Sequence, residues 1–172
     1  IMQASATHRW PRKPYPVTNA MSFTSRVTNR TVVVTGGSRG VGFGLVKQFL
    51  DRGNDVVATT RQVKTADQLH SLAKESGERL RVTQLDTASV ASIKEWATEL
   101  KQHYDRIDVL VNNAGIYGRR LQLHEFEEED FLQNFTTNAL GPFFVIQNLR
   151  KQGLLGPPGG LIVNVSSVMA SH

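Results

Sequence analysis

The chain has 172 residues, of which 40% are hydrophobic, and a formal net charge of +5 at pH 7. It contains no cysteine, which excludes disulfides and cysteine-ligated metal sites, and we expect no metal ion. No apolar run approaches the ~20 residues that a membrane-spanning helix needs, so we expect no membrane partner.

The excess positive charge lies in the first 30 residues. This segment holds five basic side chains and no acid, whereas residues 31–172 carry 15 basic and 15 acidic side chains. The rest of the chain therefore lacks the clustered charge of a nucleic-acid surface, and we expect no nucleic-acid partner. Three prolines between 11 and 16 predict a disordered basic leader over 1–30. We expect a cytoplasmic protein with a non-native start, or a plastid or mitochondrial protein if the leader is a transit peptide.

From Thr31 onward, short apolar runs alternate with amphipathic segments. The runs are rich in Val, Ile and Leu without polar alternation, which predicts strands that are buried on both faces. Strands that alternate with helices form right-handed βαβ units and a parallel sheet. The predicted strands are 31–35, 55–60, 80–85, 109–112 and 160–165, and the predicted helices are 41–52, 89–104 and 127–149.

The first strand leads into a glycine-rich turn, "TVVVTGGSRGVG". Its spacing, T-G-x-x-x-G-x-G, places Gly36, Gly40 and Gly42 between a valine strand and an amphipathic helix. Glycines allow the backbone to approach a pyrophosphate closely, and the helix N-terminus offers free N–H groups to its charge. The turn predicts a dinucleotide site, the alternative being a glycine-rich loop without a ligand.

Several further motifs occur in register with this turn: "QLDTAS" at 84–89, "LVNNAG" at 110–115, "NFTTNALGPFFV" at 134–145 and "GGLIVNVSSVMA" at 159–170. Together they resemble the short-chain dehydrogenase/reductase family over 31–172, and its carbonyl-reductase-like branch related to sniffer and C-factor proteins most of all. The resemblance implies a Rossmann-type doubly wound parallel sheet, here with five strands in the order 3-2-1-4-5. It also implies a homo-oligomer for the full-length form.

The second strand indicates which cofactor is used. An NAD enzyme places an acid at the end of this strand to hold the ribose 2′-hydroxyl, but here the position is Thr60. Arg61 follows, and Arg39 lies in the glycine turn, so two guanidinium groups are available for a 2′-phosphate. We therefore predict NADP(H). Asp86, after the third strand, is predicted to accept a hydrogen bond from the adenine amino group, or to act as a helix N-terminal residue.

Asn112 ends the predicted fourth strand, and Asn113, Ala114 and Gly115 follow it. The resemblance implies that this turn lies behind the cofactor. We expect Asn112 to bridge two backbones with its amide, and Gly115 to permit close approach of the cofactor. The complete cofactor-binding prediction is Gly36, Ser38, Arg39, Gly40, Val41, Gly42, Arg61, Asp86, Asn112, Ala114 and Gly115.

Two candidate catalytic residues come next. Asn138 lies inside a predicted helix, and Pro142, four residues later, has no N–H to bond its carbonyl. We expect a kink there, and the resemblance implies that the Asn138 carbonyl holds a water. The resemblance makes Ser167 the residue that hydrogen-bonds the substrate carbonyl, with Ser166 as the alternative.

The tyrosine that delivers the proton in this family is not found. None of the three tyrosines, Tyr15, Tyr104 and Tyr117, has a lysine four residues later. In the family that motif follows the serine strand, so we expect a partial sequence or a short isoform, C-terminally incomplete. The predicted function is NADP-dependent hydride transfer between nicotinamide and a small-molecule carbonyl or alcohol, with little turnover by this chain alone. The alternative is a naturally short, non-catalytic nucleotide-binding or regulatory protein.

Overall fold

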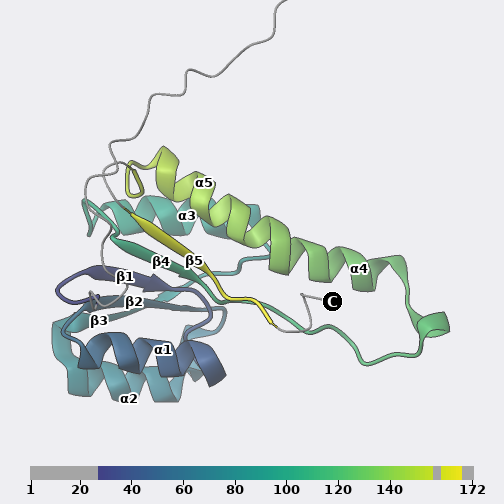
Figure 1. The fold of residues 1–172 in the computed structure, drawn as a ribbon, viewed down its shortest axis with the longest axis horizontal. Coiled ribbons are helices and arrows are strands. Elements are labelled where there is room, and N and C mark those ends of the chain that lie inside the picture. The colour runs from purple at the N-terminus through teal and green to yellow at the C-terminus, as the bar shows by residue number, and fades with distance from the viewer. Residues whose placement is uncertain (1–26, 157–159, 168–172) are drawn as a thin grey trace, which may run out of the picture.

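Five parallel strands form the centre of the molecule in the order β3-β2-β1-β4-β5, as predicted (Figure 1). The computed structural model describes residues 27–156 and 160–167. Every strand boundary lies within one residue of its predicted position. The strands are β1 (Thr31–Val34), β2 (Asp55–Thr60), β3 (Leu80–Gln84), β4 (Val109–Asn112) and β5 (Leu161–Asn164).

Helices cover both faces of the sheet, α1 and α2 on one side and α3 and α5 on the other (Figure 1). Helix α4 continues through a π-helical segment, η4, into α5, so the three form one long rod. Helix α2 was not predicted, because its sequence is short and polar and buries only Leu69. The helices are α1 (Gly40–Asp51), α2 (Asp67–Ser76), α3 (Val90–Lys101), α4 (Glu128–Phe135), η4 (Thr136–Leu140) and α5 (Gly141–Lys151).

The core consists of two apolar layers, one on each face of the sheet. Successive strand residues point into opposite layers. Val33 packs with the α3 and α5 side chains, and Val32 and Val34 pack with those of α1 and α2. This two-sided burial explains why the strands lack polar alternation. Val90, the first residue of α3, is 38% exposed.

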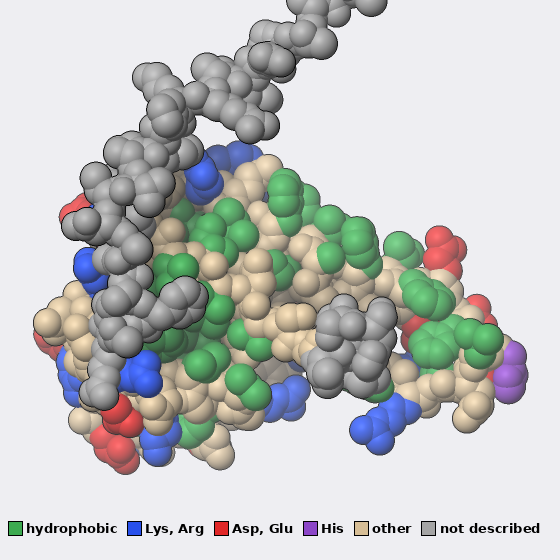
Figure 2. Space-filling view, viewed as in Figure 1, with side chains coloured by type: hydrophobic (Ala, Val, Ile, Leu, Met, Phe, Trp, Pro, Cys, Tyr) green, Lys and Arg blue, Asp and Glu red, His purple; other side chains and the backbone are tan. Residues whose placement is uncertain are grey.

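Apolar side chains are also exposed at two places. At the edge strand β5, Leu161 is 50% exposed and Ile162 39%. Along the α4–η4–α5 rod, Phe131, Phe135 and Phe143 are each more than half exposed. Figure 2 shows hydrophobic side chains following this rod and gathering around the lobe that precedes α4.

Residues 27–30, at the end of the predicted leader, contact the domain. Asn54 donates from its amide to the Val27 carbonyl at 2.9 Å, and accepts from the Arg30 N–H at 3.1 Å. Residues 1–26 lie outside the described residues. Within the described ranges, no helix combines the length and apolarity needed to cross a membrane.

The carboxyl ends of β1 and β4 are joined by Thr35 and Asn113. The Thr35 hydroxyl accepts from the N–H groups of Asn113 and Ala114, both at 3.0 Å. In return, the Asn113 amide donates to the carbonyls of Thr35 at 2.9 Å and Gly36 at 3.1 Å. The backbone bridge predicted for Asn112 is therefore made by Asn113, while Asn112 donates to the side chain of Asn164 on β5 at 2.9 Å.

The glycine turn packs directly against this β1–β4 joint. Gly36 has φ +67°, and a Cβ there would lie 2.9 Å from the Ala114 Cα. A Cβ on Gly42 would collide with the Gly36 carbonyl and the Asn113 amide. Both positions therefore require glycine because the backbone has no space for a larger residue.

Replacing Gly42 with alanine tests this packing. We expect Gly42→Ala to lower the free energy of unfolding by about 1–3 kcal/mol, the usual cost of overpacking. Gly44→Ala is the matched control, because it lies in the same helix with open space around its Cβ. The control should gain up to about 1 kcal/mol from helix propensity. Urea denaturation measures both variants, and equal stability of the two would contradict the close packing.

Candidate nucleotide-binding cleft

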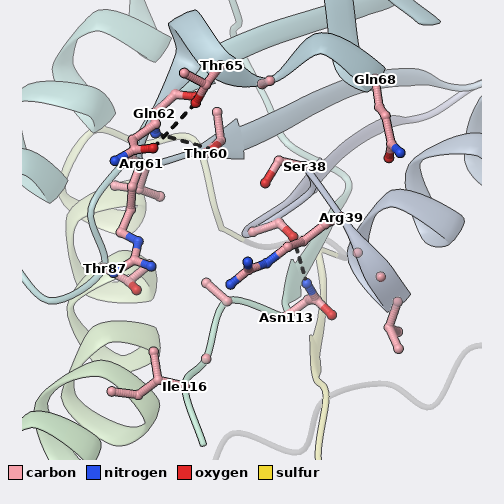
Figure 3. A pocket seen from close by; sticks show the side chains of 18 of the residues that line it. Ser38, Arg39, Thr60, Arg61, Gln62, Thr65, Gln68, Thr87, Asn113 and Ile116 are labelled. Atoms are coloured by element: carbon pink, nitrogen blue, oxygen red, sulfur yellow. Dashed lines mark hydrogen bonds between the residues drawn. The ribbon is translucent and has the colours of Figure 1, made fainter. Parts of the chain in front are cut away.

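A cleft of about 750 Å³ opens at the carboxyl ends of the strands (Figure 3). Its walls come from the turn after β1, the segments after β2 and β3, the segment after β4, and Thr137 of η4. After β1 the chain builds outward to β2 and β3, and then crosses to β4 on the other side. The cleft therefore lies at the topological switch point, where parallel α/β sheets bind ligands.

The glycine turn and the start of α1 form one wall of this cleft. Arg39 precedes the helix in an extended conformation, and Gly40 has φ +56°. The first turn of α1 contains no acidic residue, so the positive end of its dipole is not neutralised. The free N–H groups there suit a phosphate.

Two arginines line the same cleft from different elements. Arg39 extends from the glycine turn, and Arg61 extends from the end of β2 toward Thr87 (Figure 3). Thr60 ends β2 where an NAD-type acid would lie, and its hydroxyl accepts from the Gln62 N–H at 3.4 Å. Asp67, at the start of α2, adds one carboxylate to this wall.

The far end of the cleft is formed by the segment after β4. Ala114, Gly115 and Ile116 line it together with Thr137. Asn138 fixes this segment: its Oδ1 accepts from the Ile116 N–H, and its Nδ2 donates to the Ile116 carbonyl, both at 2.8 Å. A Cβ on Gly115 would lie 3.2 Å from the same Oδ1, so glycine lets the two segments approach.

The kink predicted at Asn138 takes the form of a π-helical turn, Thr136–Leu140. Gly141 donates its N–H to the Thr136 carbonyl, five residues earlier, where an α-helix would span four. Pro142 supplies no N–H to the Asn138 carbonyl. A π turn of this kind is frequent at functional sites and here turns Asn138 toward the segment after β4.

Nine of the predicted site residues line the cleft: Gly36, Ser38, Arg39, Gly40, Val41, Gly42, Arg61, Ala114 and Gly115. Asn112 is buried beneath it and pairs with Asn164. Asp86 accepts from the Ala88 N–H at 3.0 Å in the turn before α3, but the N-cap of that helix is Ser89, and the adenine contact of Asp86 stays a prediction. Asn138 reaches the cleft through Ile116, and Ser167 is exposed three residues after β5.

The prediction did not include the remaining residues that line the cleft. Several of them follow the ends of β2 and β3, where the rule for parallel sheets would have placed them. Others come from α2 and η4, whose place beside the cleft depends on tertiary packing. These residues are Thr60, Gln62, Thr65, Ala66, Asp67, Gln68, Leu85, Thr87, Asn113, Ile116 and Thr137.

No tyrosine of the described ranges lines the cleft. Tyr104 packs against the core, and desolvation by burial raises the pKa of its phenol. Tyr117 is 74% exposed, beneath the Arg120 guanidinium. Across the same ranges, no group of three or more His, Asp or Glu side chains is arranged to hold a metal ion.

Beyond Ile116, the chain is tied to α4 by an ion pair. Arg119 donates from Nε and Nη2 to the two carboxylate oxygens of Asp130, both at 2.7 Å. Asp130 also accepts from the Glu127 N–H, and its side chain is only 7% exposed. The hydrogen bonds from Arg119, followed by that from Glu127, lower the pKa of Asp130 to about 2.

This shift predicts how stability depends on pH. A carboxyl whose pKa is lowered by folding stabilises the protein above its unfolded pKa of about 3.9, and the effect is lost as pH falls toward 2. We expect the difference in unfolding midpoint between the wild type and Asp130→Asn to be constant above pH 5. It should shrink between pH 4 and 2, as followed by urea denaturation across pH. A difference that does not change down to pH 2 would contradict the assignment.

Comparison with known proteins agrees with this geometry. The family model for short chain dehydrogenase matches residues 30–172. A 3beta-hydroxysteroid dehydrogenase of Mediterraneibacter gnavus is 32% identical over 143 residues, which cover 83% of this chain and 51% of that protein. The chain spans about half the length of the curated relatives it matches.

Solved structures that resemble this chain include oxidoreductases of similar fold. A carbonyl reductase from Pseudomonas aeruginosa PAO1 superimposes with a TM-score of 0.73 and 34% identity, covering 82% of this chain and 63% of that one. A blue fluorescent protein from a metagenomic library, in complex with NADPH, gives a TM-score of 0.74 and 31% identity, covering 84% and 58%. The fold, the cleft at the switch point and these matches establish that the chain belongs to the short-chain dehydrogenase family of oxidoreductases.

Proposed function

We propose that the cleft binds NADP(H), and that residues 31–172 are the nucleotide-binding part of a carbonyl or alcohol oxidoreductase. The observation that carries this proposal is the combination of a glycine cradle with two arginines, Arg39 and Arg61, along one cleft. β2 ends in Thr60 and not in an acid, so no carboxylate at that position repels a 2′-phosphate. The structural neighbour in complex with NADPH supports the same cofactor.

The cleft fits such a dinucleotide along its whole length. Gly40, around whose Cβ position nothing lies within 4 Å, leaves the backbone bare where a pyrophosphate would approach, and the start of α1 offers its N–H groups there. Arg39 and Arg61 would then hold the 2′-phosphate of the adenosine half. Gly115, Ile116 and Thr137, at the opposite end, would hold the nicotinamide half.

In this proposal, the bound nicotinamide supplies or accepts the hydride. Ser167 donates a hydrogen bond from its hydroxyl to the substrate oxygen and holds the carbonyl in place. Asn138 contributes its backbone carbonyl, to which Pro142 offers no N–H, as an acceptor for a water. The carbonyl reductase among the structural neighbours and the hydroxysteroid dehydrogenase among the relatives support a small-molecule carbonyl or alcohol as substrate.

Partner contacts and the leader complete the proposal. The exposed phenylalanines of the α4–η4–α5 rod, Phe131, Phe135 and Phe143, are proposed to contact a second copy in a homo-oligomer. We also propose that residues 1–30 are a basic leader.

The cofactor assignment is tested by replacing both arginines. Arg39→Ala/Arg61→Ala should weaken NADPH binding by about 10- to 100-fold, because charge-assisted hydrogen bonds to the 2′-phosphate are lost. NADH, which lacks that phosphate, should change by less than about twofold. Arg52→Ala, at the far end of α1, is the control and should change neither affinity. Isothermal titration calorimetry measures the NADPH and NADH affinities of each variant. An equal loss of affinity for NADPH and NADH would refute the 2′-phosphate site.

Turnover separates the oxidoreductase from a non-catalytic nucleotide-binding protein. We expect this 172-residue chain to reduce aldehydes and ketones at least about 100-fold more slowly than the same chain extended by its natural downstream sequence. General acid catalysis typically contributes about 10²- to 10⁴-fold, and no described tyrosine is placed to supply it.

One panel of carbonyl substrates serves both forms, with Ser167→Ala in the extended form as a second comparison. Comparable activity from the short form would place the proton donor within these 172 residues. An inactive extended form would favour the non-catalytic alternative.

A further inference from the structure

The connection between β4 and α4 is long and holds little regular structure. Residues 113–127 contain only a three-residue 3-10 helix, η3 (Leu123–Glu125). Figure 1 shows this connection running alongside α4 before it reaches the lobe at η3. A long irregular connection beside a candidate site is usually functional, and it needs fixed contacts to hold one conformation.

Three side chains of the rod, four residues apart, provide these contacts. Asp130, Asn134 and Asn138 lie on successive turns of α4 and η4. We call them the polar ladder. They contact residues 116–119, here called the docked segment.

Each step of the polar ladder engages a different part of the docked segment. Asn138 bonds both backbone groups of Ile116 at 2.8 Å. Gly118 turns with φ +81° against Asn134, where a Cβ would lie 3.2 Å from the side-chain Oδ1. Arg119, the last residue of the docked segment, donates two 2.7 Å hydrogen bonds to Asp130.

The ladder is itself held rigid. Asn134 donates from its amide to the Asp130 carbonyl at 2.7 Å, which fixes its side chain one turn along the helix. Asp130 is 7% exposed and also accepts from the Glu127 N–H at 3.0 Å. The Arg119 contact is therefore bidentate, with one partner largely withdrawn from water, unlike an exposed ion pair of little consequence.

We propose that Arg119, Asp130 and Asn134 are positioning residues: by docking residues 116–119 onto the rod, they fix Ile116 and Asn138 at the nicotinamide end of the cleft. The proposal rests on the proposed function, because it takes the Ile116 end of the cleft as the nicotinamide end. None of the three residues is among those that line the cleft within the described ranges. They act through Ile116, which does line it.

The experiment compares Arg119→Met with its neighbour Arg120→Met. Arg119 holds Asp130, whereas Arg120 lies over the exposed Tyr117 ring, so Arg120→Met removes an arginine from the same loop without touching the ladder. Asp130→Asn is a second variant, since it keeps an oxygen for the Glu127 N–H and loses the charge that Arg119 binds.

The first readout is hydrogen exchange of single amides by NMR. Arg119→Met and Asp130→Asn should speed exchange of the Ile116 amide by about tenfold, because the docked segment opens more often. The amides of Val33 and Leu110, in the sheet core, report global stability and should remain slower to exchange than the Ile116 amide in every variant. Arg120→Met should match the wild type at all three amides.

The second readout compares NADPH with 2′-phospho-ADP-ribose, which lacks the nicotinamide. Arg119→Met should weaken NADPH by about three- to tenfold and leave 2′-phospho-ADP-ribose within about twofold. Arg119→Lys, which keeps the charge but not the fork, should recover part of the loss. Equal weakening of both ligands would indicate general destabilisation and overturn the proposal.

The exchange data separate this proposal from the proposed function. If the wild type binds neither ligand, the proposed function fails for this chain, and Ile116 exchange alone decides the docking. Faster exchange in Arg119→Met than in Arg120→Met would support docking by the ladder, and equal rates would overturn it.

Discussion

The joint between the ends of β1 and β4 is the constraint on which the rest of the site depends. Thr35 and Asn113 exchange hydrogen bonds between side chain and backbone, so two neighbouring strands end in one fixed arrangement. The glycine turn then packs on this joint with no space for a Cβ at Gly36 or Gly42. The start of α1 and the segment after β4 are placed by the same contacts. The joint therefore fixes the position of two walls of the cleft.

The two ends of the cleft differ in chemistry: one is lined by arginines, and the other by the segment that contains Ile116. At one end Arg39 and Arg61 present guanidinium groups from two separate elements. At the other, Ile116 is held by Asn138 across the π turn. A rigid middle with different chemistry at each end suits a long, asymmetric ligand such as a phosphorylated dinucleotide, whose two halves need different partners. We therefore expect such a ligand to bind in one orientation.

Much of the sheet and of the cleft could be predicted from the sequence, because strand periodicity and glycine spacing are local signals. The five strands and the glycine turn follow from them, whereas Arg61 was predicted from the charges after the second strand, and Ala114 and Gly115 from the resemblance to the family. Helix α2 could not be predicted, since it buries little apolar surface and its position depends on packing. Asn112 was predicted to bridge two backbones, but Asn113 makes the bridge: adjacent residues face opposite ways, and only the register of the strands decides which one reaches Thr35. The Arg119–Asp130 pair had no sequence signal, because its residues are 11 positions apart across an irregular connection.

The central claim is that this cleft holds NADP(H) in one orientation. A crystal structure of the chain with NADP⁺ tests it most directly. We predict that the pyrophosphate lies over residues 36–42 at the start of α1, the 2′-phosphate between Arg39 and Arg61, and the nicotinamide beside Ile116. A 2′-phosphate bound away from both arginines, or a dinucleotide bound in the reverse orientation with its nicotinamide at Arg61, would contradict it.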